Sequence, residues 1–277
     1  MRPGAGTTGC PLYIQHLRQY FLSMKATNWE FTNRALLFGL IFAFTFPLYV
    51  LDHENSTAAL ANWIGTRFRM DASLLAHMLF AGAAFLLIVA ALIRTWASAY
   101  LQAEVVYAAE VKTESLVADG PYRYVRNPLY LANVLMAIGM GTLMSRVGFF
   151  VAVMAMLIFC YRLIIREEAE LRASQGEHYE RYRKAVPRLL PTLWPHIASA
   201  GRPARWSAGF KAEFWYWGFA ASLLTFTATL NIKLFFAMLG ASIVLLWLST
   251  LLFQKKSNSQ ASVGSSEPST NSTATKP

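Results

Sequence analysis

Two short segments hold most of the polar and aromatic side chains that could do chemistry in this otherwise apolar chain. The first, 119–130, reads DGPYRYVRNPLY, and the second, 161–191, contains the adjacent acids Glu167 and Glu168. Arginine binds carboxylate or phosphate groups, glutamate can hold an ammonium group or hydroxyls, and tyrosine rings pack against cations. These residue types suit a small charged ligand. They include no nucleophilic triad and no metal-ligand spacing.

A position at a membrane surface is the other explanation of the same residues. Tyrosine is typical of the headgroup level, and arginine side chains extend to lipid phosphates. Glu168 could form an ion pair on a solvated helix face with Arg172, one turn further on. That explanation leaves Glu167 beside Leu163 and Leu171, where a carboxylate needs a partner. Both explanations stay open for the single tyrosines and arginines.

The elements that must position these side chains are apolar helices. Hydrophobic residues make up 55% of the 277 residues and charged residues only 14%, well above the apolar share of a soluble domain. A bilayer span needs about 20 apolar residues. Six stretches come close: 35–51, 73–93, 128–145, 147–165, 213–230 and 233–253. The sequence therefore predicts an all-α, polytopic membrane protein with about six transmembrane helices.

The positive charge of the chain indicates its orientation. With the N-terminus inside, 21 of the 25 lysines and arginines fall on the same side of the predicted spans. By the positive-inside rule, both termini are predicted to be cytoplasmic, in a bacterial inner membrane or the endoplasmic reticulum. The net charge of +10 then reflects topology and anionic headgroups. No motif of a nucleic-acid-binding module accompanies it, so no nucleic-acid partner is expected.

Five segments follow from this pattern: a cytosolic leader (1–34), two transmembrane helices (35–96), a core (97–195), a transmembrane hairpin with Asn231 at its turn (196–253) and a tail (254–277). In the leader, 11–31 has the pattern of an interfacial helix. Residues 52–72 are expected to form a short external loop, and 97–118 a separate helix at the interface. The tail is rich in Ser, Thr and Asn and is predicted to be disordered. Cys10 and Cys160 exclude a disulfide framework.

The fourth apolar stretch is expected to continue as a helix beyond the membrane. Its helical pattern runs to about residue 174, and Gly176 is suited to end it. A second helical segment follows and is broken by three prolines, Pro187, Pro191 and Pro195. The G-x-G of Gly139 and Gly141 lies in the third stretch, where glycine allows close approach of a helix or of a ligand.

Four motifs in order make part of the chain recognisable. They are G-P-Y-R-x-x-R-N-P-x-Y at 120–130, E-E-x-x-L at 167–171, G-x-x-Y-x-x-Y at 176–182 and V-P-R-x-x-P at 186–191. Together they resemble the isoprenylcysteine carboxyl methyltransferase and phospholipid methyltransferase superfamily. The resemblance covers about residues 110–195. Many relatives carry histidine where Asn127 stands, and histidine near Glu114-Ser115.

The resemblance implies an enzyme that binds S-adenosyl-L-methionine in a cytosolic cofactor cleft and methylates a lipophilic acceptor at the cytosolic face of the membrane. By motif, the implied cofactor contacts are Tyr122, Arg126, Asn127, Pro128, Tyr130, Gly139, Gly141, Glu167, Glu168, Tyr179 and Tyr182. The last two, with Pro187, would form a lid. Arg126 and Glu167 are predicted to be catalytic, and no metal is expected. A prenylcysteine carboxylate and a phospholipid amine both remain open as acceptors, as does the oligomeric state.

Two other functions are compatible with parts of the pattern. Membrane sterol reductases share a similar R-x-P-x-Y motif and bind NADPH, but they tend to carry Arg-Asp where this chain has Glu167-Glu168. A transporter or non-catalytic scaffold would also be polytopic. A transport path usually needs charged residues within the spans, and the sequence predicts none deep inside one.

Overall fold

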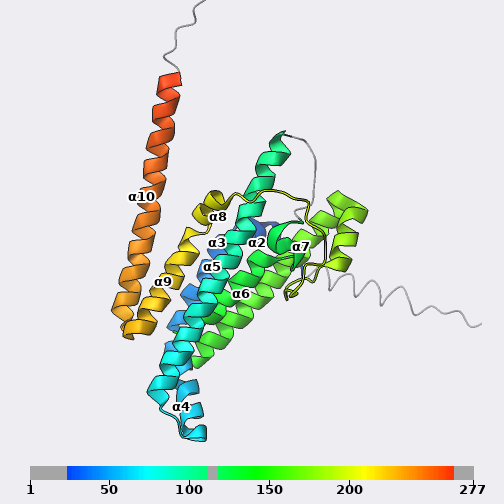
Figure 1. The fold of residues 1–277 in the computed structure, drawn as a ribbon. Helices are drawn as coiled ribbons and strands as arrows, with labels where there is room; N and C mark the ends of the chain where they lie inside the picture. Colours follow the sequence, from blue (N-terminus) through cyan, green and yellow to red (C-terminus); the bar gives the residue numbers. More distant parts are fainter. Residues whose placement is uncertain (1–23, 111–117, 265–277) are drawn as a thin grey trace, which may run out of the picture.

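The protein is a bundle of α-helices in a computed structural model that describes the backbone of residues 24–110 and 118–264 and the side chains of 24–101 and 118–248 (Figure 1). Within these residues the structure has no β-strand and a single isolated bridge, Asn55 to Ser145. In chain order the elements are α2 (Asn28–Thr32), α3 (Arg34–Thr45), η1 (Phe46–Val50), α4 (Ser56–Phe68), α5 (Ala72–Glu110), η2 (Gly120–Arg123), α6 (Pro128–Gly141), α7 (Arg146–Ala185), α8 (Trp206–Ala212), α9 (Phe214–Thr229) and α10 (Ile232–Gly264).

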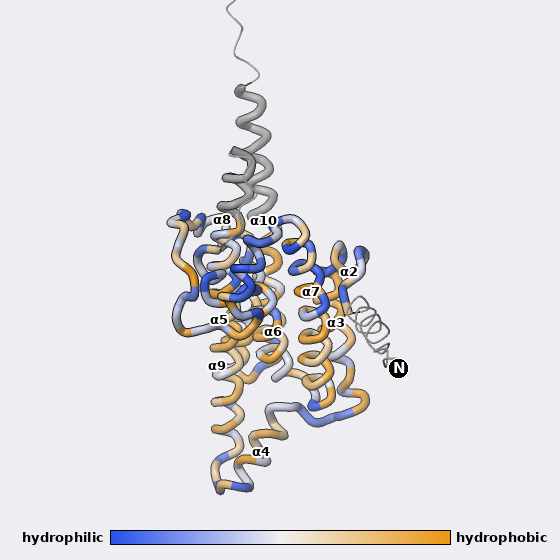
Figure 2. The backbone as a smooth tube through the Cα atoms, turned by 90° about the vertical axis from the view of Figure 1, so that its right-hand side faces the viewer, coloured by the Kyte–Doolittle hydropathy of each residue, from blue (hydrophilic) through white to orange (hydrophobic). Residues whose placement is uncertain are grey.

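The all-α prediction is confirmed, and the bundle is apolar along most of its length (Figure 2). Two of the described helices, at Ala72–Leu101 and Arg146–Ala185, are long and apolar enough to cross a membrane. Three shorter apolar segments, Arg34–Val50, Pro128–Gly141 and Ile232–Leu248, accompany them. The hydrophilic residues gather mainly at the end of the bundle where α2 and α8 lie (Figure 2). The predicted count of six spans stays a prediction.

Two predicted elements differ from the structure. The segment 97–118 was expected to be a separate interfacial helix, but α5 continues unbroken from Ala72 to Glu110; residues 111–117 lie outside the described ones. No glycine or proline interrupts the chain after Gly82 in this helix, so the apolar part simply extends into the polar part. The expected external loop 52–72 contains α4, which starts where the Asn55 side chain accepts hydrogen bonds from the backbone N–H groups of Thr57 and Ala58.

The start of α4 also holds the end of α6. The last carbonyl groups of a helix have no partner within it. Here the Thr57 hydroxyl donates to the carbonyl of Thr142 (2.9 Å), and the Asn55 amide donates to the carbonyls of Thr142 (3.1 Å) and Met144 (3.2 Å). The Ser56 hydroxyl donates to the carbonyl of Gly141 (3.2 Å). These bonds fix the far end of α6, whose other end begins the site described below.

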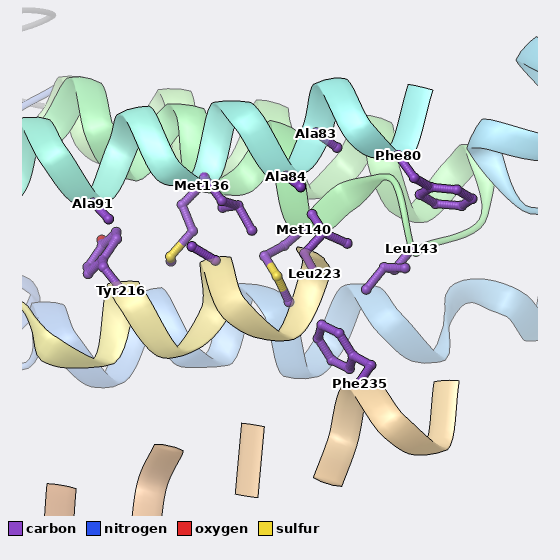
Figure 3. Packing of buried hydrophobic residues seen from close by; sticks show 12 residues of the cluster. Phe80, Ala83, Ala84, Ala91, Met136, Met140, Leu143, Tyr216, Leu223 and Phe235 are labelled. Atoms are coloured by element: carbon purple, nitrogen blue, oxygen red, sulfur yellow. The ribbon is translucent and has the colours of Figure 1, made fainter. Parts of the chain in front are cut away.

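The main core lies where α5, α6 and α9 meet, with Phe235 of α10 at its edge (Figure 3). One face of α5 is made of small side chains, among them Ala83, Ala84 and Ala91. These let α6 approach closely, and its methionines Met136 and Met140 fill the space toward α9. The predicted hairpin of α9 and α10 is confirmed, with Leu230 (φ +49°) and Asn231 at the turn.

The remaining differences concern the C-terminal part of the chain. Helix α8 was not expected within 196–212, and α10 continues to Gly264, into the segment predicted to be disordered from residue 254. The chain beyond 264 and the leader before residue 24, including most of the expected helix at 11–31, lie outside the described residues. The predicted break at Gly176 is confirmed, because this glycine interrupts α7 with φ +52° and ψ −122°. After it, the last turns of α7 bend away from the helix axis (Figure 1).

Candidate active site

A cavity of about 590 Å³ lies where α3, the turn before α6, and the outer half of α7 meet. It brings together seven of the eleven residues predicted to bind a cofactor. These are Tyr122, Arg126, Asn127, Pro128, Tyr130, Glu167 and Tyr182. The polar turn before α6 and the long helix α7, which are separated in sequence by the whole of α6, therefore form two walls of a single cavity.

The turn at 119–123 is held in place by close packing of Gly120 against α5 and by hydrogen bonds to Asp119. Gly120 has φ +58°, and the ring of Tyr100 on α5 lies 2.4 Å from where a Cβ atom would stand. Asp119 is buried and accepts hydrogen bonds from the Ser199 hydroxyl (2.6 Å) and the backbone N–H groups of Ala200 (2.9 Å) and Arg202 (3.3 Å). Burial alone would raise the pKa of Asp119, but these hydrogen bonds outweigh it and hold the pKa below its usual value.

The chain after α7 runs back along this turn, and we call residues 186–205 the strap. The backbone N–H of Arg126 donates to the carbonyl of Pro187 (2.9 Å). Further along, Thr192 N–H donates to the Tyr124 carbonyl (3.1 Å) and His196 N–H to the Arg123 carbonyl (3.1 Å). The turn and the strap therefore support each other without regular secondary structure. The prolines that end the helix leave the strap free to follow the turn.

Glu168 is the centre of a buried group of charges that we call the Glu168 cluster: Arg126, Asn127, Glu168 and Arg188. The Glu168 residue is 5% exposed. Arg188 donates to both carboxylate oxygens (3.2 and 2.8 Å), and Asn127 Nδ2 lies 3.4 Å from Oε1. Arg126 Nη1 is 3.0 Å from Oε1. The hydrogen bond from Arg188 to Glu168 raises the pKa of the guanidinium.

This geometry excludes one of the two explanations left open for Glu168. A pair with Arg172 on a solvated face was the alternative to a binding role, but Glu168 is buried and pairs with Arg126 and Arg188. Arg172 instead forms an ion pair with Glu180 (2.5 Å) across the break at Gly176. The i+4 spacing allowed the pair with Arg172, but two arginines from outside the helix compete for the same carboxylate.

Three polar side-chain atoms at the cavity have no hydrogen-bond partner among the described residues. Arg126 Nε is buried and has no hydrogen-bond partner within the described residues. Glu167 accepts a hydrogen bond from the Tyr130 hydroxyl at Oε1 (2.6 Å), and Oε2 accepts none in the described part of the chain. The third is Gln175, whose Oε1 is buried without a partner among the same residues. No motif marked Gln175; only its position directly before Gly176 could have drawn attention to it.

Four of the predicted cofactor residues do not line the cavity. Glu168 lies behind Arg126, and Tyr179 is fully buried in a small apolar cluster with Tyr182 and Val186. An added Cβ at Gly139 would lie 2.8 Å from Leu87 Cγ on α5, and one at Gly141 would lie 2.8 Å from Phe149. Both glycines thus serve close packing in this structure. Cofactor contacts for these four residues stay predictions.

A second buried polar cluster lies between α5, α6 and α9, and we call it the Arg94 cluster: Arg94, Ser98, Asn133, Glu213 and Tyr216. Arg94 makes a two-pronged ion pair with Glu213, and its Nη1 donates to Asn133 Oδ1 (2.8 Å). Ser98 donates to Glu213 (2.5 Å), and Tyr216 donates to Asn133. Arg94 lies within the apolar helix Ala72–Leu101, directly after the predicted span 73–93, and the expectation of no charge deep in a span stays a prediction.

Among the described residues, no group of three or more His, Cys, Asp or Glu side chains could hold a metal ion.

Comparison with known proteins bears on the same part of the chain as the cavity. Residues 77–177 match the family described as phospholipid methyltransferase. The chain is 36% identical over 86 residues to protein-S-isoprenylcysteine O-methyltransferase of Schizosaccharomyces pombe, covering 30% of this chain and 35% of that protein. It is 27% identical over 100 residues to the cobalt-zinc-cadmium resistance protein CzcN of Cupriavidus metallidurans, covering 36% of this chain and 43% of that protein.

The chain thus spans less than half the length of each of these curated relatives, and no solved structure matches it. The matched region contains α6, most of α5 and the part of α7 that carries Glu167 and Glu168. Fold and site together are those of an apolar helical protein with a ligand cavity at the hydrophilic end of its bundle. This region belongs to the superfamily of isoprenylcysteine carboxyl methyltransferases and phospholipid methyltransferases.

Proposed function

We propose that the protein is a membrane methyltransferase that uses S-adenosyl-L-methionine and methylates a lipophilic acceptor at the cytosolic face. The observation that carries the proposal is the cavity itself. In a region of methyltransferase ancestry, it brings a buried arginine donor and a carboxylate with a spare oxygen to one concave surface. Its volume of about 590 Å³ lies in the usual range for small-molecule sites, about 300–1,000 Å³.

The residues present fit the chemical groups of the methyl donor. The unpartnered Nε of Arg126 suits the carboxylate of the aminoacyl part, and the spare oxygen of Glu167 suits its ammonium group. The rings of Tyr122 and Tyr182 can pack against the sulfonium or the base. Glu168 would act through Arg126, which it holds in place from behind.

When bound, S-adenosyl-L-methionine supplies a methyl group on a positively charged sulfur. Transfer breaks the carbon–sulfur bond and forms a bond from that carbon to an acceptor oxygen or nitrogen. The role of the chain is to orient both reactants in line and to exclude water. Arg126 and Glu167 would fix the donor from two sides, and Tyr130 would hold the Glu167 carboxylate in position. A carboxylate acceptor needs no base, whereas an amine must arrive neutral and lose a proton after transfer.

A lipophilic acceptor is supported by the apolar residues of the cavity and of the surrounding bundle. Leu101, Leu129 and Leu171 line the cavity among its polar groups. Large apolar side chains such as Phe85, Phe150 and Ile158 are exposed on the outside of α5 and α7, as expected of lipid-facing helices. We therefore infer a multi-pass membrane protein with cytoplasmic termini. The names of the relatives fit either a prenylcysteine carboxylate or a phospholipid amine as acceptor.

Calorimetry on the purified chain in detergent tests the proposal. The protein should bind S-adenosyl-L-methionine and its product S-adenosylhomocysteine, and should not bind NADPH. Binding of NADPH alone would overturn the proposal in favour of a reductase. Binding of neither would favour a transporter or scaffold. Transfer of a labelled methyl group into membrane extracts, followed by identification of the labelled lipid, would then identify the acceptor.

A further inference from the structure

The Oε1 atom of Gln175 is a buried polar atom that no contact within the described residues explains. Gln175 lines the cavity, and its Oε1 is buried without a hydrogen-bond partner within the described residues. Buried acceptors are nearly always paired, because losing water without gaining a donor is unfavourable. An acceptor in this state inside a ligand cavity indicates a donor on the ligand.

The position of Gln175 along α7 separates it from the charges of the cavity. Glu168, Leu171 and Gln175 lie on one face of the helix, and Gln175 is about 10 Å beyond Glu168 at about 1.5 Å per residue. Arg126 pairs with Glu168 and is therefore at the near end. Glu167 and Glu170 also precede Leu171 in the helix.

The one other charged lining residue, Arg34, belongs to the same near end. Its guanidinium lies 4.5 Å from the centre of the Phe31 ring, and that of Arg166 lies 4.5 Å from the same ring. Arg34 therefore stands beside the part of α7 that carries Glu167. The four charged lining residues, Arg34, Arg126, Glu167 and Glu170, thus lie toward one end of the cavity, and the uncharged Leu171 and Gln175 follow toward the other.

S-adenosyl-L-methionine, the proposed methyl donor, likewise has a charged end and an uncharged end. Its ammonium, carboxylate and sulfonium lie at one end and its neutral adenine at the other. Matching charge to charge places the adenine at Gln175. Tyr182, whose hydroxyl donates to the Tyr122 carbonyl (2.9 Å), contributes a fixed aromatic ring to the same cavity and belongs to one apolar cluster with Leu171. A glutamine amide can accept from the 6-amino group of adenine and donate to a ring nitrogen, as in the recognition of adenine in DNA.

We infer that Gln175 binds the adenine of the methyl donor and selects for its 6-amino group. The inference rests on the proposed function, since it assigns one end of the same cavity. It makes Gln175 a binding residue for the base, outside the motifs that indicated the rest of the site.

Calorimetry with S-adenosylhomocysteine and an analogue carrying purine instead of adenine tests the inference. The wild-type protein should bind the adenine compound roughly tenfold more tightly, because a buried hydrogen bond is worth about that factor. Gln175→Met should bind both compounds at the weaker level. Without ligand, its thermal stability should equal or exceed that of the wild type, since the substitution removes a buried acceptor that has no partner.

Three comparisons make the result specific. Ser174→Ala is the matched control, because Ser174 also lines the cavity but donates its hydroxyl to the Leu171 carbonyl (3.3 Å); it should keep the wild-type preference. Gln175→Glu retains an acceptor and should restore part of the preference. Gln175→Leu provides a second apolar variant if Gln175→Met folds poorly.

The inference is overturned if both apolar variants keep the wild-type preference for the 6-amino group. It is also overturned if they weaken binding of S-adenosylhomocysteine but not of methylthioadenosine, which lacks the aminoacyl part, since Gln175 would then contact that part instead. Equal binding of both purine compounds by the wild type refutes the inference alone. Binding of neither refutes the proposed function as well.

Discussion

The Glu168 cluster and the Arg94 cluster are both buried groups of charges between helices, but only the Glu168 cluster contributes residues to the cavity of about 590 Å³. In the Arg94 cluster, Glu213 receives hydrogen bonds from Arg94 and Ser98, and Asn133 receives them from Arg94 and Tyr216. In the Glu168 cluster, Arg126 keeps a buried Nε without a partner among the described residues. A complete set of bonds indicates a role in holding helices together, and an incomplete set beside a cavity indicates a role in binding.

Removing Glu213 should give the largest loss of stability. Glu213→Ala leaves the Arg94 guanidinium buried without its counter-charge, which typically costs about 3–5 kcal/mol. Because no residue of the Arg94 cluster lines the cavity, the folded fraction should bind S-adenosylhomocysteine as the wild type does. Chemical unfolding in detergent, with calorimetry at low temperature, measures both quantities.

The double variant Arg94→Met with Glu213→Leu is the control for that substitution. Replacing a buried ion pair by apolar residues of similar size is often nearly neutral, so it should recover most of the stability lost in Glu213→Ala. A double variant as unstable as the single one would mean that the pair itself, and not the unpaired charge, matters. A loss of ligand binding in the stable double variant would contradict the purely structural role.

Glu167→Gln should have the opposite effect to Glu213→Ala: a large loss of ligand binding and a small loss of stability. The amide keeps an acceptor for the Tyr130 hydroxyl but loses the negative charge proposed to hold an ammonium group. A hydrogen bond to a charged group contributes about 1.5–3 kcal/mol, so affinity for S-adenosylhomocysteine should fall roughly tenfold to a hundredfold. Calorimetry and thermal unfolding on the same preparation provide the comparison.

The neighbouring substitution Glu168→Gln is the matched control, because Glu168 bears the ion pairs of Arg126 and Arg188. It should lower both stability and affinity. If Glu167→Gln leaves affinity unchanged, Glu167 is only a partner of Tyr130. If both variants lose stability equally, the distinction between the two acids of the pair is wrong.

Asp119 is a buried carboxylate close to the cavity that we expect to stabilise the fold without binding the ligand. It is fully paired with the strap and does not line the cavity. Asp119→Asn should therefore lower stability by about 1.5–3 kcal/mol near pH 7, the usual worth of a hydrogen bond to a charged group. The affinity of the folded protein should change little.

The pH dependence of that difference follows from the lowered pKa. A carboxyl group with a lower pKa in the folded state contributes stability above its unfolded pKa and loses it as pH falls through the folded value. The unfolding temperatures of wild type and Asp119→Asn should thus differ at neutral pH and converge below the ordinary aspartate value of 3.8. A difference that stays constant down to pH 3 would show that the charge of Asp119 is not what holds the strap.

Local patterns in the sequence found residues on both walls of the cavity and missed the contacts between them. The run at 120–130 and the acid pair on α7 stand out because their residue types are unusual next to apolar helices. The partners of Glu168 and Arg94 could not be predicted, because Arg188 and Glu213 come from elements 20 and 119 residues away. Gln175 has no pattern at all, since an ordinary polar residue becomes informative only when its surroundings leave it unpaired.

Helix boundaries were mispredicted for a related reason. Arg94 ended the apolar stretch in the sequence, so the helix was expected to stop there. In the structure its charge is neutralised by Glu213, and α5 continues to Glu110. The loop expected at 52–72 became α4 because Asn55 caps it and the end of α6 provides acceptors for its first turn. In both cases a distant contact supplied what the local sequence lacked.

Removing the ion pair of Arg172 with Glu180 should have the smallest effect on stability and on ligand binding. Because this pair is charged but not buried, it shows whether burial or charge causes the larger effects predicted above. It spans the break at Gly176, close to the cavity, but both side chains are substantially exposed to solvent. Exposed ion pairs contribute little, because water and salt screen them. Arg172→Ala should leave the unfolding temperature and the affinity for S-adenosylhomocysteine within experimental error of the wild type. A clear loss of affinity would mean that this pair holds the last turns of α7, with Tyr182, in the position that the ligand needs.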